Sequence, residues 1–169
     1  MTVTLGTTLK VTSEYANFKI QPSKSIHFKM SSASGVNASD ECMEVFQELK
    51  LKKKYKYILY KINDEKDKTE IVLDRAEENA TYEDFKDVLV KELKQQPRYA
   101  VFDFDYEKTG EGPRNKLVFF SWVPDTAPVK TKMLYASSRE AIRKKLVGVG
   151  IEVQGTDEEE VDYATVLEK

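Results

Sequence analysis

Apolar residues recur at intervals of three and four along four segments of the chain, and this spacing predicts four amphipathic helices. The predicted helices cover residues 39–50, 81–96, 129–147 and 156–167. Three of them begin at a hydroxyl side chain that can cap a helix: Ser39, Thr81 with Asp84 three residues later, and Thr156 with Glu159. Proline 97 and the glycines at 148 and 150 mark the ends of the second and third helices.

Runs of β-branched and aromatic residues predict five strands, at residues 55–62, 69–73, 99–106, 116–123 and 151–153. The polar stretch NDEKDK joins the first two strands, and the glycine-containing stretch KTGEGPRN joins the next two, so we expect two hairpins. Hairpins interspersed with helices predict an α+β fold, in which a mostly antiparallel mixed sheet is covered by helices on both faces.

The long predicted helix, residues 129–147, has two different sides. The side expected to face the core gathers Leu134, Ser138, Ala141, Ile142 and Leu146, with Tyr135 at its edge. The opposite side gathers Lys132, Met133, Arg139, Glu140, Arg143 and Lys144. From the residues alone, this charged side is either a solvated face or a binding surface. Lys145 falls within the apolar arc, so we expect it to extend its ammonium group toward solvent or to mark the fraying end of the helix.

Two further basic segments are likewise either binding surfaces or merely solvated parts of the chain. Arg114 and Lys116 flank the predicted turn of the second hairpin, where they either reach a partner or keep the turn soluble. The stretch KLKKKYKY, residues 50–57, faintly resembles a nucleic-acid patch, but alternate residues of it enter a central strand. Only the lysines before Tyr55 are therefore expected to stay free.

Composition and charge exclude several classes of protein. The 169 residues are 40% hydrophobic and 33% charged, which is typical of a single globular domain. Of the 27 basic and 29 acidic residues, four lysines and one glutamate lie in residues 1–29, which leaves 23 basic and 28 acidic residues in the remainder. That acidic balance argues against nucleic acid as a partner. No apolar run approaches the roughly 18 residues of a membrane helix, so we expect no membrane protein.

The sequence also offers little for catalysis. A serine or cysteine nucleophile needs a base, and the single histidine, His27, lies in the segment expected outside the fold. The lone Cys42 forms no internal disulfide, and we expect neither a metal nor a cofactor. Asp103 and Asp105 point to the same side of one predicted strand. A small phosphohydrolase using this pair stays an alternative, although charges that face solvent or a neighbouring lysine are the commoner arrangement.

Residues 1–33 are rich in serine and threonine and lack a firm apolar period, so we expect one domain, residues 34–169, preceded by an N-terminal extension. This extension is interpreted as disordered, as a translated leader of an over-extended gene model, or as a genuine segment that crowds the start of the domain. A mitochondrial presequence is disfavoured because residues 1–29 contain no arginine.

Residues 34–169 resemble the actin-depolymerising factor/cofilin family. The resemblance rests on five stretches in family order: SGV at 34–36, FQELKLKKKYKYILY at 46–60, RYAVFDFDY at 98–106, VFFSWVPDTAPVKTKMLYASSREAIRKKL at 118–146 and EVQGTDEEEVDYATVLE at 152–168. It implies a single ADF-homology domain with a five-stranded mixed sheet between helices. It also implies a protein that binds actin monomers and filaments, favours ADP-bound actin, and severs and depolymerises filaments without acting as an enzyme.

In this family the long helix enters the cleft between two actin subdomains. By resemblance, the residues implied in monomer and filament binding are Ser34, Gly35, Val36, Lys130, Lys132, Met133, Arg139, Glu140, Arg143 and Lys144. A filament-specific site is implied at Arg114, Lys116, Glu168 and Lys169. The chain departs from many relatives by stopping at Lys169, which bears on the strength of its filament contact.

The resemblance carries regulation as well. Ser34 corresponds to the family's regulatory serine, where a phosphate would repel an acidic partner surface. Phosphoinositide binding is implied at Lys130, Lys132, Arg143 and Lys144. We expect a monomer located in the cytoplasm at the actin cytoskeleton; some relatives also occur in the nucleus or nuclear matrix, although no basic nuclear signal is evident here. The alternative binding module is a glia maturation factor-like protein that acts on the actin-branching complex, and the intact helix TKMLYASSREAIRKK disfavours it.

Overall fold

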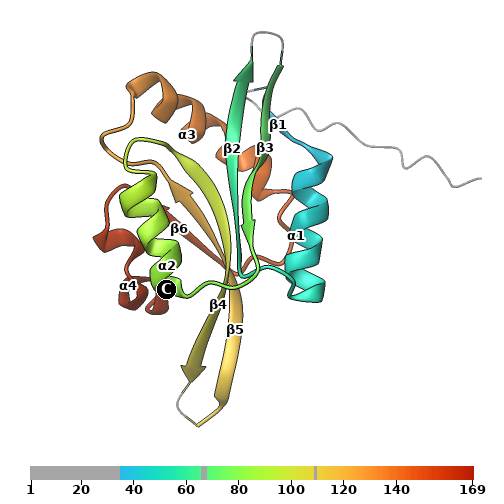
Figure 1. Ribbon diagram of the computed structural model, residues 1–169, viewed down its shortest axis with the longest axis vertical. Coiled ribbons are helices and arrows are strands. Elements are labelled where there is room, and N and C mark those ends of the chain that lie inside the picture. The colour runs from blue at the N-terminus through green and yellow to red at the C-terminus, as the bar shows by residue number, and fades with distance from the viewer. Residues whose placement is uncertain (1–34, 66–67, 109) are drawn as a thin grey trace, which may run out of the picture.

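The structure is a computed structural model that describes residues 35–65, 68–108 and 110–169. The predicted extension, residues 1–33, lies outside these ranges. Within them, six strands form one sheet in the order β1-β3-β2-β4-β5-β6 (Figure 1). Their bounds are β1 Asn37–Ala38, β2 Tyr57–Glu65, β3 Lys68–Glu77, β4 Arg98–Lys108, β5 Gly112–Trp122 and β6 Ile151–Gly155. The four central strands pair antiparallel, while β1 and β6 add parallel strands at the two edges. The predicted mixed, mostly antiparallel sheet is thus confirmed.

The strand count of five was one too low. The additional strand, β1, is two residues long and pairs with β3 at Asn37 and Ala38, and a segment so short carries no alternation of apolar and polar residues. The second hairpin is also longer than predicted. Its ladder continues outward to the pair Lys108 and Gly112, because backbone hydrogen bonds extend the strands into the polar stretch that we had interpreted as a turn.

Four α-helices are present in the described residues, α1 Asp40–Lys52, α2 Tyr82–Asp87, α3 Val129–Arg143 and α4 Tyr163–Leu167. A π-helical turn, Val88–Glu92, continues α2, and a 3₁₀ turn, Glu159–Val161, precedes α4. Two predicted caps are confirmed: the Ser39 hydroxyl accepts from the Cys42 N–H, and Thr81 forms a reciprocal capping box with Asp84.

Three predicted helix boundaries were wrong. The helical segment that begins with α2 ends at Glu92 rather than at residue 96. The third helix ends at Arg143 rather than near residue 147, since a turn held by tertiary contacts replaces its last residues. The last helix is capped by Asp162, whose carboxylate accepts from the Ala164 N–H. Thr156 instead donates to Glu160 from both its backbone N–H, at 2.7 Å, and its hydroxyl, at 2.9 Å. The predicted Thr156 and Glu159 box is therefore absent.

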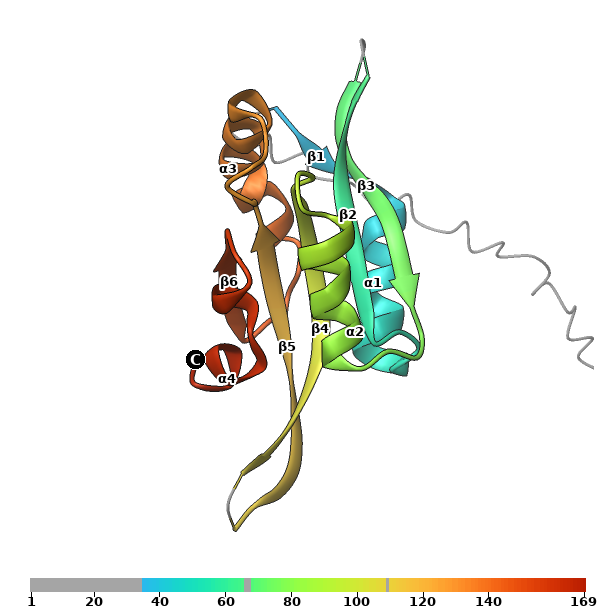
Figure 2. The same cartoon turned by 60° about the vertical axis from the view of Figure 1, so that its left-hand side comes forward.

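The core lies in two layers, one on each face of the sheet. Helices α1 and α3 cover one face with the buried side chains of Phe46, Leu49 and Ile142, among others. Helices α2 and α4 cover the other face, where Phe85 and Val166 are fully buried (Figure 2). Neighbouring residues of the central strands alternate between the two layers, as the period of a strand requires. The prediction of a sheet between helices is confirmed.

Candidate functional site

Helix α3 rests on the sheet through a narrow buried stripe. Tyr135, Ser138 and Ile142 are each at most 3% exposed. Tyr135, predicted at the edge of the apolar arc, is buried, and its hydroxyl accepts from the Ile62 N–H at 2.9 Å while its carbonyl accepts from the Tyr99 hydroxyl. The sheet therefore fixes the rotation of the helix about its axis and so decides which residues face outward.

The outward side of α3 presents cations beside apolar surface. Lys130, Glu140 and Lys144 are exposed, and Lys144 lies 3.8 Å from Glu140 in a loose pair one helical turn apart. Met133 is 68% exposed. We define the α3 surface as Lys130, Lys132, Met133, Arg139, Glu140 and Lys144. A methionine side chain is flexible and polarisable, so an exposed methionine among cations offers apolar area that adapts to a partner.

A groove of about 360 Å³ separates α3 from the neighbouring strands β5 and β6. It is lined by Ser121, Val123, Lys132, Ala136, Arg139, Gln154 and Thr156. The Lys132 ammonium donates to the Asp125 carbonyl at 3.2 Å. The Arg139 guanidinium, by contrast, has no hydrogen bond or ion pair within the described ranges 35–65, 68–108 and 110–169. Arg139 is thus a cation available to an acidic group that enters the groove.

Sequence reasoning missed two polar residues of this groove, Gln154 and Thr156. They are brought there by the parallel pairing of β5 with β6, in which Ser121 lies opposite Gln154. That pairing joins segments more than thirty residues apart, and no local pattern reports it. The alternation of apolar and polar residues in IEVQG, residues 151–155, was the available signal for the strand itself, since it places Glu152 and Gln154 on one side.

Arg143 differs from the other predicted cations of α3. Its Nε contacts the Glu152 carboxylate, and its Nη1 and Nη2 donate to the carbonyls of Leu146 at 3.4 Å and Val149 at 3.3 Å. Its side chain is 27% exposed. Lys145, just beyond the helix, does not simply extend into solvent, because its ammonium donates to the Ala38 carbonyl at 2.9 Å.

The start of the domain reaches the same end of α3. Ser34, predicted as the regulatory serine, lies outside the described residues. Gly35 is exposed with a φ of 72°, whereas Val36 is 1% exposed and belongs to the core that α1 and α3 cover. The Val36 side chain therefore anchors the segment, and Gly35 is the part of the predicted N-terminal contact that the structure leaves at the surface.

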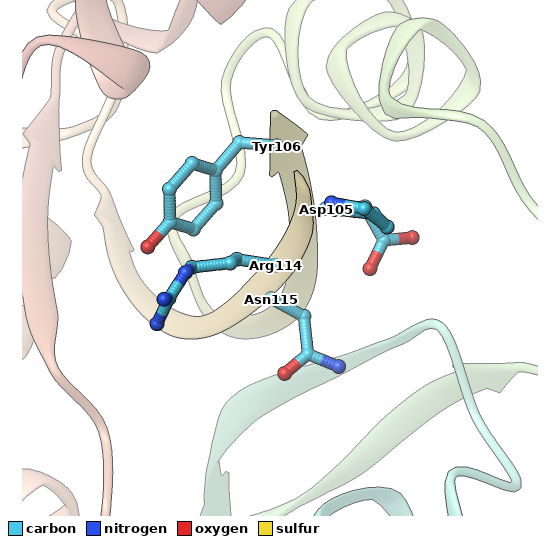
Figure 3. A pocket seen from close by; sticks show the side chains of 5 residues that line it. Asp105, Tyr106, Arg114 and Asn115 are labelled. Atoms are coloured by element: carbon cyan, nitrogen blue, oxygen red, sulfur yellow. The ribbon is translucent and has the colours of Figure 1, made fainter. Parts of the chain in front are cut away.

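The predicted filament site lies on the β4–β5 hairpin and α4. Figure 3 shows Tyr106 and Arg114 side by side on one face of this hairpin, with Asp105 and Asn115 turned to the other. Arg114 is exposed and pairs with Glu111 in the turn at 2.6 Å. Lys116 lies over the rings of Phe104 and Tyr106, at 5.4 and 5.0 Å from their centroids, and its burial lowers the pKa of its ammonium group.

Helix α4 is fastened to the base of this hairpin. The ring of Tyr163 stacks on Phe104 with centroids 4.9 Å apart, and its hydroxyl donates to the Asp105 carbonyl at 3.3 Å. Glu168 and Lys169 follow this helix and are exposed. The structure thus attaches the two parts of the predicted filament site to each other through Tyr163.

The two aspartates of β4 are held by lysines. Both carboxylate oxygens of Asp103 accept from Lys53 at 2.9 Å, and Asp105 pairs with Lys56. This is the arrangement that the sequence favoured over a paired-carboxylate site. Residues 35–65, 68–108 and 110–169 contain no cluster of three or more histidine, cysteine or acidic residues arranged for a metal ion. Within the same ranges, every helix is too short or too polar to cross a bilayer.

Comparison with known proteins identifies the family. The sequence model described as cofilin/tropomyosin-type actin-binding protein matches residues 35–169. The chain belongs to this cofilin family. It is 52% identical over 137 residues to the cofilin of Mycosarcoma maydis, covering 81% of this chain and 95% of the relative. It is 50% identical over 139 residues to the cofilin of Saccharomyces cerevisiae, covering 82% of this chain and 94% of the relative.

A solved structure carries the same fold. The crystal structure of Streptomyces griseoflavus cofilin matches with a TM-score of 0.71 at 42% identity, over 79% of this chain and 96% of that one. The curled mixed sheet between helices is accordingly the fold of the cofilin family, as the resemblance of the five sequence stretches implied.

Proposed function

We propose that this chain binds actin monomers and filaments through the α3 surface, and that it severs and depolymerises filaments. The observation that carries the proposal is the outward side of α3, where Arg139 and an exposed Met133 stand on a helix whose other side is locked to the sheet. Membership of the cofilin family supports actin as the partner and a place at the actin cytoskeleton in the cytoplasm.

The α3 surface suits a helix that enters a groove of its partner. Exposed methionine supplies apolar area that adapts to the partner, and cations around it set the register against acidic groups. Because Arg139 has no partner of its own in the described ranges, a carboxylate of actin can approach it without displacing an internal ion pair. Loss of one such central contact costs about 1–3 kcal/mol, or roughly ten- to a hundredfold in affinity.

Severing follows from a difference in affinity rather than from covalent chemistry. A ligand that prefers one filament twist, or the ADP-bound state, shifts subunits toward that state by its difference in binding free energy. Where a decorated stretch of filament meets a bare stretch, two filament segments of different twist are joined. We expect the filament to break at these boundaries. The hairpin cations Arg114 and Lys116, with Glu168 and Lys169, are proposed to touch a second subunit, which confines their effect to filaments.

Two forms of regulation are proposed at the same surface. A phosphate on Ser34, next to the exposed Gly35, would add negative charge where the domain meets an acidic partner. Phosphoinositide headgroups would compete with actin for Lys130, Lys132 and Lys144, because anions of either origin seek the same cations. Arg143, which the resemblance includes in this set, is already paired with Glu152.

Sedimentation with purified actin filaments at two pH values tests the proposal. The wild-type chain is expected to pellet with filaments and to raise the unpolymerised fraction of actin. Arg139→Glu is expected to weaken both filament and monomer binding by about ten- to a hundredfold. Lys91→Glu is a matched control, since Lys91 is exposed on the opposite face of the sheet and pairs with Asp87. A wild-type chain that neither pellets with filaments nor raises free actin contradicts the proposal.

A further inference from the structure

The turn that follows α3 is held by cationic side chains at three of its carbonyl groups. Arg143 donates to the carbonyls of Leu146 and Val149, and the Lys50 ammonium of α1 donates to the carbonyl of Val147 at 2.7 Å. Arg143 is bound in addition to Glu152, an exposed residue of edge strand β6. One guanidinium therefore joins the end of α3, the turn 144–150 and the strand that borders the groove.

This arrangement leaves Arg143 few donors for a partner. A guanidinium carries five N–H groups on three nitrogens, and each nitrogen of Arg143 already makes one contact inside the chain. A contact with actin that used these groups would have to break a charge-assisted pair and release two carbonyls of the turn. Arg139, one turn earlier, has no such internal partners in the described residues. Of the two arginines of this helix, Arg143 is thus engaged by groups of the chain itself, whereas Arg139 is available to a partner.

We propose that Arg143 is a positioning residue for actin binding and not a contact residue. Through Glu152 and the turn carbonyls it holds α3 against β6, which fixes the groove and the direction in which Arg139 and Lys144 face outward. The inference rests on the proposed function, because it assigns a role within the same binding surface. The proposal predicts that Glu152 supports binding to an acidic partner, although its own carboxylate adds a negative charge.

A double-mutant cycle on the full chain separates the two roles, with affinity for purified actin monomer as the measurement. Arg143→Ala, Glu152→Ala and the double variant are compared with wild type. If Arg143 positions the surface, Glu152→Ala weakens affinity by about tenfold, and the double variant binds no worse than Arg143→Ala alone, because the two residues act through one link. Glu158→Ala is the charge-matched control; Glu158 is exposed and lies near Lys86 instead.

Two outcomes overturn the inference. Unchanged or tighter binding by Glu152→Ala would mean that the released guanidinium reaches actin itself, and additive losses in the double variant would mean that the two residues act separately. Hydrogen exchange of the amides of residues 144–150 gives an independent readout, expected to be faster in both single variants while thermal unfolding shows that each remains folded. If wild type binds and Arg139→Glu does not, but the cycle is additive, the positioning role alone has failed.

Discussion

The α3 surface and the β4–β5 hairpin carry most of the two groups of predicted actin-binding residues, and they are built differently. Along its length α3 lies against the sheet, with Tyr135, Ser138 and Ile142 buried beneath it. The outer part of the hairpin extends beyond the helices, and residues 112–115 are all exposed (Figures 1 and 2). A surface fixed by the core suits a contact that every actin subunit receives, whereas a projecting arm suits one that reaches a second subunit.

This difference means that binding and stability are coupled for residues beneath α3 and separate at the hairpin. The orientation of the α3 surface depends on buried groups, so a change under the helix alters both the free energy of unfolding and the affinity for actin. The hairpin tip contributes little to the core. Changes there are expected to affect filament binding with almost no effect on folding.

The largest effect that follows from this comparison comes from beneath α3. Ile142→Ala removes a fully buried side chain between α3 and the sheet, and is expected to lower the free energy of unfolding by about 2–5 kcal/mol. Urea unfolding followed by circular dichroism measures this loss, and binding to actin monomer should weaken in the same variant under folding conditions.

Met133→Ala is the matched control on the outward side of the same helix. Because Met133 is 68% exposed, the free energy of unfolding should change by less than about 0.5 kcal/mol while actin affinity falls. If both variants destabilise the chain equally, the assignment of an inner and an outer side to α3 is incorrect.

A smaller effect on stability is expected at the charged network beside α3. Asp74 accepts from Arg98 at 2.9 Å and pairs with Lys61 at 3.1 Å, and Arg98 in turn acts electrostatically on the Tyr135 hydroxyl of α3. Burial opposes ionisation of Asp74, but the hydrogen bonds from Arg98 and Lys61 outweigh it and lower its pKa. Asp74→Asn is therefore expected to cost about 1.5–3 kcal/mol near pH 7.

The pH dependence of that cost has a definite sign. A carboxylate with a lowered folded pKa stabilises the fold fully above its unfolded pKa of about 3.9, and this contribution is lost as the pH falls through the folded value. The difference in unfolding free energy between wild type and Asp74→Asn should consequently shrink below about pH 4. A difference that stays constant from pH 7 to pH 3 would show that the loss comes from packing and not from charge.

Much of this fold was predictable because local rules decide it. The period of apolar residues located α1 and the buried side of α3, and the Thr81 and Asp84 box marked the start of α2. What was missed depends on distant partners. Strand β1 exists through its pairing with β3, and Thr156 bonds to Glu160 where the sequence suggested a cap.

The candidate site follows the same division. Periodicity correctly placed Met133 and Glu140 on the outward side of α3, since this needs only the angle between successive residues. It did not distinguish Arg139 from Arg143, which lie one turn apart, because the partner that engages Arg143 belongs to β6. Tertiary contacts decide which cations are paired inside the chain, and helical spacing does not encode those contacts.

A small effect on stability is also expected at the hairpin, and it tests the separation of the two regions most directly. In the variant carrying both Arg114→Ala and Lys116→Ala, Arg114 gives up one exposed pair with Glu111, and Lys116 gives up its contacts with the Phe104 and Tyr106 rings. Exposed pairs and such cation–π contacts are each worth about 1 kcal/mol or less, so folding should change little.

Filament affinity should fall by about tenfold, the effect of losing a contact worth about 1.4 kcal/mol, while monomer affinity stays within about twofold of wild type. Sedimentation with filaments and titration of labelled monomer measure the two affinities. Equal losses in both assays would show that the hairpin belongs to the surface shared by monomers and filaments.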